Sequence, residues 1–253
     1  MPTGAGNTGR YELSRKRLLE RTVGALALLA AAYLGLLAFP YPLFSYQASF
    51  QNIAVYSDQP IPGAIGPVLR TVEDRLNRSA LNDPALQHRV FLCNSNRLFA
   101  FFTNFNHRAG GVNYAWLNRN IFLRRSNIDN DRLVGPSGRE VPGERTLDYF
   151  VAHEITHSLE VNTVGRYRYL RLPAWKREGY ADYIGKGAHF NFADQVAAFR
   201  RGAWEMDPAR SGLYLRYQLL VTYVMDQKGA SAQTLLTQPF DESALENELR
   251  AGQ

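Results

Sequence analysis

The first strong pattern along the chain is an apolar segment that carries no charge. No charged residue lies between Thr22 and Ser57, and the seventeen residues Val23–Phe39 are apolar before Pro40 and Pro42 end the helix. At about 1.5 Å per residue they form a helix of roughly 25 Å, near the lower limit for crossing a bilayer. The pattern predicts a transmembrane anchor at residues 22–40.

Two other interpretations of this segment stay open. A cleaved signal peptide usually has a shorter apolar run followed by small residues just before the cut, and residues 38–50 offer no such pair beyond the apolar core. A core helix of a soluble protein usually carries a polar stripe, which this segment lacks. Both comparisons favour an uncleaved signal anchor.

The basic residues predict the orientation of this anchor. Five Lys/Arg precede the apolar segment, and the next one along the chain is Arg70. By the positive-inside rule, residues 1–21 form a basic cytoplasmic tail, and the rest of the chain lies on the extracytoplasmic side, in the periplasm or outside the cell. The expected localisation is therefore a single-pass protein of the cell membrane. The Gly/Thr-rich residues 1–14 are expected to be disordered.

After the anchor, strand patterns come first and helical patterns follow. Alternation predicts strands at Gln51–Ser57, Arg89–Cys93 and within Tyr114–Arg124, with a helix in Pro62–Ser79 whose apolar residues recur every three or four positions. Beyond a Gly/Pro-rich loop at 126–143, periodicity predicts helices at 144–161, 173–185, 191–204, 213–228 and 242–249. This order predicts an α+β domain over residues 50–253, with a small mixed sheet and helices followed by a mainly helical lobe.

Composition and charge narrow the possible functions. The 253 residues are 45% apolar and 21% charged, which is an ordinary globular composition and excludes disordered, fibrous and coiled-coil classes. The single cysteine, Cys93, excludes a disulfide framework or a thiolate zinc cluster and is expected to be a buried thiol. Half of the net charge of +6 belongs to residues 1–22, so the remaining chain is too weakly basic to predict a nucleic-acid partner.

Catalytic chemistry is indicated by one motif in the predicted helix 144–161. His153-Glu154-Ile155-Thr156-His157 matches H-E-x-x-H, in which two histidines four residues apart face one Zn²⁺. Glu154, between them, is placed to take a proton from a zinc-bound water. Apolar residues occupy another side of this helix, so we expect it to be amphipathic, with its polar face free to line a cleft.

A second helix offers carboxylates for the same site. Glu178 and Asp182 are one turn apart on the helix that Pro173 begins, so both approach a metal from one face. A metal-bound histidine usually donates its other N–H to a carboxylate, a role that suits Asp182. The metzincin pattern is excluded, because Glu160 and Thr163 stand where it needs glycine and histidine.

The segment W-x-x-E-G-x-A-D-Y at residues 175–183 resembles the third-ligand helix of gluzincin metallopeptidases, in the peptidase MA clan. The resemblance implies a zincin-like lobe, zinc held by His153, His157 and Glu178, and Asp182 as the partner of His153. The next helix also resembles the gluzincin pattern, and it implies Tyr214 as the donor to an oxyanion, with Tyr217 one turn further as the alternative.

Fold-level analogy places the strand near Asn118–Leu123 at the sheet edge that pairs with an extended substrate. The isolated histidines His88, His107 and His189 are expected at the surface or in hydrogen bonds rather than at the metal.

These patterns together predict a membrane-anchored zinc metallopeptidase that hydrolyses a peptide or protein substrate, with Glu154 as general base. The alternative is an anchored zinc-containing scaffold or assembly factor with little turnover. Glu154 favours the enzyme, because water activation needs this carboxylate and zinc binding does not. The oligomeric state stays open.

Overall fold

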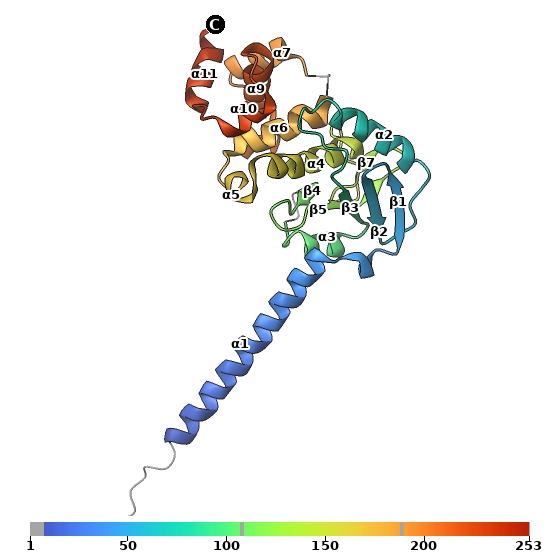
Figure 1. The fold of residues 1–253 in the computed structure, drawn as a ribbon, viewed down its shortest axis with the longest axis vertical. Helices are drawn as coiled ribbons and strands as arrows, with labels where there is room; N and C mark the ends of the chain where they lie inside the picture. The colour runs from blue at the N-terminus through green and yellow to red at the C-terminus, as the bar shows by residue number, and fades with distance from the viewer. Residues whose placement is uncertain (1–7, 107–108, 188–189, 253) are drawn as a thin grey trace, which may run out of the picture. The chain divides into compact units, whose positions relative to one another are not determined.

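The computed structural model describes residues 8–106, 109–187 and 190–252, and the chain falls into two compact units, residues 1–42 and 43–253 (Figure 1). The expected disorder of residues 1–7, together with His107 and His189, lies outside the described residues. From Thr8 onward the expected disorder is wrong, because a helix has already begun there.

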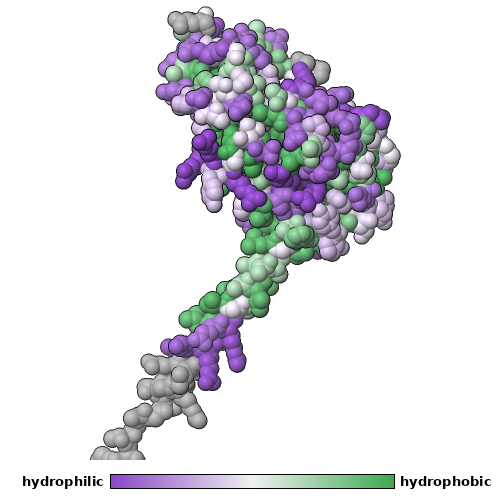
Figure 2. Space-filling view, viewed as in Figure 1, coloured by the Kyte–Doolittle hydropathy of each residue, from purple (hydrophilic) through white to green (hydrophobic). Residues whose placement is uncertain are grey.

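The first unit contains the helix α1 (Thr8–Ala38). It starts before the expected anchor because the basic segment that precedes the apolar residues is rich in Arg, Lys and Leu, which are good helix formers. An 18-residue window within its portion Arg15–Ala38 has a mean hydropathy of 1.7, and this portion is long and apolar enough to cross a membrane. Figure 2 shows the hydrophobic surface that follows the hydrophilic start of this helix.

The second unit is built around a five-stranded mixed sheet. Its strands lie in the order β1-β2-β3-β5-β4, with β2, β3 and β5 parallel and the outer strands β1 and β4 antiparallel to their neighbours. The strands are β1 (Tyr46–Phe50), β2 (Ile53–Ser57), β3 (His88–Cys93), β4 (Gly111–Asn113) and β5 (Asn120–Arg124). A separate two-stranded ribbon pairs β6 (Ser126–Asn127) with β7 (Arg132–Leu133).

Helices make up most of the remaining chain. They are α2 (Ile65–Leu76), α3 (Asn96–Phe102), α4 (Leu147–Val164), α5 (Arg166–Tyr169), α6 (Ala174–Lys186), α7 (Phe192–Arg200), α8 (Pro208–Ser211), α9 (Leu215–Thr222), α10 (Ala232–Thr237) and α11 (Glu242–Ala251). Single turns of other helix types lie at Tyr41–Leu43, Trp204–Met206 and Tyr223–Gln227. The predicted α+β class, with a mixed sheet before a mainly helical region, is confirmed.

Both faces of the sheet are covered, and successive side chains of each strand point to opposite faces. Val90 of β3 pairs in register with Val55 and Ile121, and this row belongs to the core shared with α2 and α4. The next residue, Phe91, faces the other way and stacks on Phe122 with ring centroids 5.3 Å apart. Phe102 of α3 stacks on Phe122 at 4.3 Å, so an aromatic layer covers this second face.

Several expected boundaries differ from the structure. The compact unit begins at residue 43 rather than 50, because it includes β1, a mostly exposed edge strand that was not predicted from the sequence although Tyr46, Ala48 and Phe50 alternate with polar residues. The helices α3 and α10 were not predicted, since segments of six or seven residues are too short to show helical periodicity. By contrast, all five apolar residues expected on α2 are buried: Ile65, Val68, Leu69, Val72 and Leu76.

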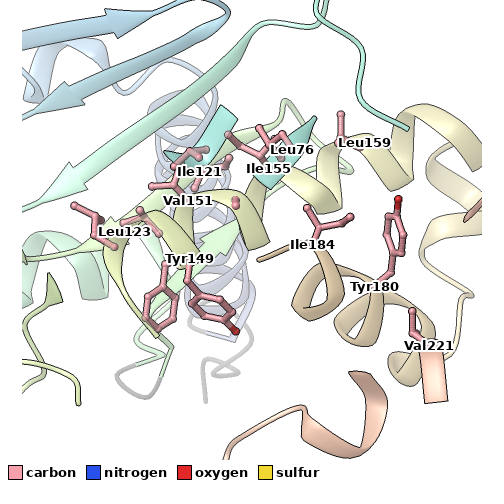
Figure 3. Close-up of a cluster of buried hydrophobic side chains, with 14 of the residues drawn as sticks. Leu76, Ile121, Leu123, Tyr149, Val151, Ile155, Leu159, Tyr180, Ile184 and Val221 are labelled. Atoms are coloured by element: carbon pink, nitrogen blue, oxygen red, sulfur yellow. The ribbon is translucent and has the colours of Figure 1, made fainter. Parts of the chain in front are cut away.

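The helix α4 is a central core helix. Every residue from Leu147 to Val161 is buried, so the expected amphipathic character of this helix is wrong, although His153, Glu154 and His157 line a cleft as expected. Figure 3 shows Val151 and Ile155 of α4 close to Ile121 of the sheet, and Figure 1 shows α6 along another side of α4. The polar side chains of α4 therefore need partners within the protein.

His88 is buried at the start of β3, with 1% of its surface exposed and no hydrogen-bond partner for either ring nitrogen. The expected surface or hydrogen-bonded position is wrong, because the residue pairs with Ile53 inside the sheet. Burial, together with the nearby charge of Arg119, lowers the pKa of His88 from 6.5 to about 4. The folded protein therefore holds this imidazole neutral.

This burial predicts a loss of stability in acid. In the unfolded chain His88 is protonated as the pH falls below 6.5, whereas in the folded protein it stays neutral until about pH 4. The free energy of unfolding therefore decreases by roughly 3 kcal/mol between these two pH values. Chemical denaturation of the detergent-solubilised chain across this range measures it. His88→Leu should lack this part of the pH dependence, and an identical slope in both proteins would contradict the assignment.

Candidate metal centre

Three potential ligands converge between α4 and α6. The donor atoms of His153, His157 and Glu178 all lie within 4.8 Å of one another. An oxygen of Glu178 is 3.5 Å from Nε2 of His153 and 3.7 Å from Nε2 of His157. Donors bound to one tetrahedral zinc lie about 3.4 Å apart, given bond lengths of about 2.0–2.2 Å. The carboxylate lies near this spacing from each imidazole, so these three side chains could hold one metal ion.

Two glycines of α6 allow close contacts with the neighbouring helices, Gly179 with α9 and Gly185 with α4. A Cβ atom on Gly179 would lie 2.5 Å from the carbonyl oxygen of Tyr217, so α6 and α9 touch backbone to backbone there. A Cβ atom on Gly185 would lie 3.1 Å from the ring of Tyr149 on α4. Gly179 therefore permits the close packing of α6 on α9.

A buried network holds His153. Its Nδ1 lies 3.0 Å from Oδ1 of Asp182, which is 1% exposed. The hydroxyl of Tyr149 donates to the same oxygen at 2.6 Å, and Nζ of Lys186 lies 2.8 Å from the other oxygen. Asp182 therefore contacts the histidine expected for it, and its contact with Nδ1 leaves Nε2 directed at Glu178. Sequence reasoning missed Tyr149 and Lys186.

His157 has a carboxylate partner of its own. Its Nδ1 lies 2.9 Å from Oε2 of Glu160, whose side chain is completely buried. The sequence patterns excluded the metzincin family at Glu160 but did not predict this contact with His157. Its spacing of three from His157 on one helix face is a signal that could have identified it as the partner. Both histidines thus present Nε2 to the same point while a buried acid holds Nδ1.

Glu154 lies where the strand β4 crosses α4. A Cβ atom on Gly111 would collide with the side chain of Leu123 and lie 2.9 Å from a carboxylate oxygen of Glu154, so a larger residue here would displace these side chains. The amide of Asn113 donates to the backbone carbonyl of Glu154 and, at 2.8 Å, to the hydroxyl of Ser158. These contacts fix the strand to the helix beside Glu154.

The edge of the sheet nearest this site is β4, not the strand expected from the sequence. β5, which contains most of Asn118–Leu123, is buried at every position between β3 and β4. The expectation is wrong because β4 covers β5, and β4 is only three residues long, too short to show alternation. β4 lies against α4 and lines the cleft.

A cleft of about 570 Å³ opens above the three potential ligands and Glu154. Tyr214, just before α9, lines it and stacks on His153 with ring centroids 6.1 Å apart. Tyr217 stacks on the far side of Tyr214 at 5.9 Å and is not among the lining residues that the structure describes. Of the two candidate tyrosines, the structure brings Tyr214 into the cleft.

Burial and mutual charge set the protonation of the site. Burial raises the pKa of Glu154, and the two histidines only partly offset this effect. Burial would lower the pKa of His153, but its hydrogen bonds to Asp182 and Glu178 outweigh burial and raise the pKa to about 10. Burial, with Glu178 and Asp182 nearby, raises the pKa of Tyr214, so its hydroxyl stays protonated and can donate a hydrogen bond.

No family model, curated protein or solved structure matches this chain.

The buried partners of the two histidines predict a dependence of zinc affinity on residues that do not bind the ion. Asp182→Asn and Glu160→Gln should each weaken zinc binding by about 10–100-fold, because each removes the charge that orients a ligand histidine. Competition with a chromophoric chelator measures the affinity. The exposed Glu144→Gln is a control with the same chemical change. Unchanged affinity in both test variants would contradict this arrangement.

Proposed function

We propose that this chain is a zinc-dependent hydrolase of gluzincin type that cleaves peptide bonds. The observation that carries the proposal is the convergence of His153, His157 and Glu178 within 4.8 Å, in a cleft that also contains Glu154. Each histidine is further held by its own buried carboxylate, an arrangement typical of metal-binding imidazoles. The helical region that carries these residues is then a zincin-like lobe.

In this proposal His153, His157 and Glu178 hold the ion, and Asp182 and Glu160 hold the two rings. A zinc ion bound by such a set supplies a Lewis acid that polarises a carbonyl and lowers the pKa of a water towards about 7. Three protein ligands also leave a coordination position open, as catalytic zinc sites require.

Glu154 moves the proton. The pKa of Glu154 is raised above that of an exposed glutamate and is therefore nearer to neutral pH. This suits a group that both accepts and returns a proton. Its Oε atoms take the proton from the attacking water and then give it to the nitrogen of the leaving amine. Tyr214 donates its hydroxyl hydrogen to the oxygen that gains negative charge on the former carbonyl.

A membrane-anchored position accompanies this activity. The helix α1 is the anchor, since its portion Arg15–Ala38 is long and apolar enough to cross a membrane. The basic residues that precede the apolar segment favour a cytoplasmic N-terminus and an extracytoplasmic domain. The substrate would then be a peptide or protein at the outer side of the membrane.

The enzymatic proposal predicts that Glu154→Gln separates zinc binding from catalysis. Glutamine keeps the shape of the side chain but cannot accept the proton, so zinc content should persist while hydrolysis of a mixed peptide library slows by at least about 10²-fold. Metal analysis and mass spectrometry of the products measure the two effects.

Glu144→Gln is again the control, and it should retain full activity. A zinc-loaded wild type with no activity on peptide, ester or amide libraries would favour the alternative, an anchored zinc-containing scaffold.

The topology predicts which fusions are active. An alkaline phosphatase fused after Gln253 should be active, because this enzyme folds only outside the cytoplasm, and the mature protein should retain the residues before Val23. Enzyme assay of the fusion and N-terminal sequencing measure these outcomes. A new N-terminus between Pro40 and Ser49 would instead indicate a cleaved signal peptide.

A further inference from the structure

Two arginines on the cleft walls have no role in the chemistry described above. Arg145 immediately precedes the N-cap of α4, and Arg177 lies on α6 next to Glu178. Both line the cleft and both are partly buried. Each is held against an aromatic ring, with Cζ of Arg145 4.8 Å from the centre of Phe150 and Cζ of Arg177 5.3 Å from the centre of Tyr169. Such a contact holds the guanidinium beside the ring while it keeps its positive charge.

Neither guanidinium is neutralised within the described part of the chain. No carboxylate there lies within 4.0 Å of Arg145 or Arg177, and the Nε atom of each is buried without a hydrogen-bond partner. Another partly buried arginine, Arg75, is paired with a carboxylate, because it contacts Asp148 at 2.8 Å. The described part of the chain therefore gives neither guanidinium a carboxylate at ion-pair distance, although Arg145 acts on the charge of Glu154 and Arg177 on that of Glu178 from further away.

The positions of these arginines bracket the two histidine ligands along α4. Arg145 lies over Phe150, one turn before His153. Arg177 lies over Tyr169, whose ring is 6.2 Å from that of His157 at the other end of the motif. A substrate lying across the site would meet a positive charge on each side of the bond to be cleaved.

The charges that line the cleft indicate that these arginines attract anions. Glu154 and Glu178 are the acidic residues among the lining side chains that the structure describes. A bound divalent ion would balance these two carboxylates, so the two guanidiniums would leave the walls with excess positive charge. In a partly enclosed cleft this excess is screened less than on an open surface.

We propose that the cleft selects substrates that carry a carboxylate near the bond to be cleaved, with Arg145 and Arg177 as the residues that bind it. This inference rests on the proposed hydrolase and names its substrate class, an acidic peptide. The carboxylate belongs either to an Asp or Glu side chain or to the C-terminus of the peptide. Both sources offer the planar pair of oxygens that a guanidinium binds in two parallel hydrogen bonds.

Binding to an inactive background tests the proposal without turnover. Fluorescein-labelled hexapeptides are compared on zinc-loaded, full-length Glu154→Gln protein in detergent, by anisotropy. One pair differs in glutamate against glutamine at a single position, and another in a C-terminal acid against a C-terminal amide. The acidic member should bind at least about 10-fold more tightly, as expected for a charge-assisted hydrogen bond. Equal binding within both pairs would overturn the proposal.

Substitutions then assign the effect to the two arginines. Adding Arg145→Gln or Arg177→Gln should remove most of the preference for the acidic peptide while leaving binding of its neutral counterpart unchanged. Arg171→Gln is the matched control, because Arg171 is exposed and is not among the described lining residues. Zinc content reports whether each variant still folds, and Arg177→Lys, which keeps the charge, should retain part of the preference. Equal loss of acidic and neutral peptides would contradict a specific role.

Hydrolysis measured on the protein with Glu154 intact distinguishes failure of the hydrolase proposal from failure of the carboxylate-binding proposal. Zinc-dependent cleavage with no preference for acidic peptides, in KM or in binding, would overturn the role of the arginines and leave the hydrolase standing. Arginine-dependent binding of acidic peptides without any cleavage would overturn the hydrolase and leave the carboxylate site standing. If cleavage occurs, the Arg→Gln variants should raise KM for acidic peptides by about 10-fold or more and change kcat less.

Discussion

The polar face of α4 lies inside the protein, and the structure around it depends on that burial. A buried ionisable group is costly unless a partner meets it. His153 contacts Asp182, which contacts Tyr149 and Lys186, and Lys186 in turn donates to the side chain of Gln218 on α9 at 3.0 Å. One network therefore joins α4, α6 and α9. The contacts that give buried His153 its polar partners thus determine how the three helices pack.

The same close packing gives the cleft its shape and its charge. Gly185 allows α6 to pack closely on α4, and Gly111 allows β4 to pack closely beside the carboxylate of Glu154. Residues of β4, α4 and α6 then form the walls of the cleft. Charges inside the helical network are neutralised by neighbours. Arg145 and Arg177 face the cleft instead, where no carboxylate within the described chain pairs with them. The paired charges of the network stabilise the fold, whereas the charges of Arg145 and Arg177 are available to a ligand.

Much of this organisation is encoded in local patterns. The apolar residues of α2 recur at helical spacing, and the order of strands and helices indicates an α+β domain. His153 and His157 lie one turn apart on any helix, so their common direction follows from the sequence alone. The pairing of Asp182 with His153 and the position of Glu178 needed a resemblance as well, because they join two helices whose packing no local spacing determines.

The sequence by itself determined the helix that carries the motif, the apolar N-terminal segment and the class of the fold. Tertiary structure decided that α4 is buried all round, that β4 rather than β5 forms the sheet edge, and that Glu160 holds His157. It also decided that Arg145 and Arg177 meet in one cleft although 32 positions separate them along the chain. Side-chain periodicity reports which face of an element is apolar, whereas the partner of a buried charge depends on which elements pack together.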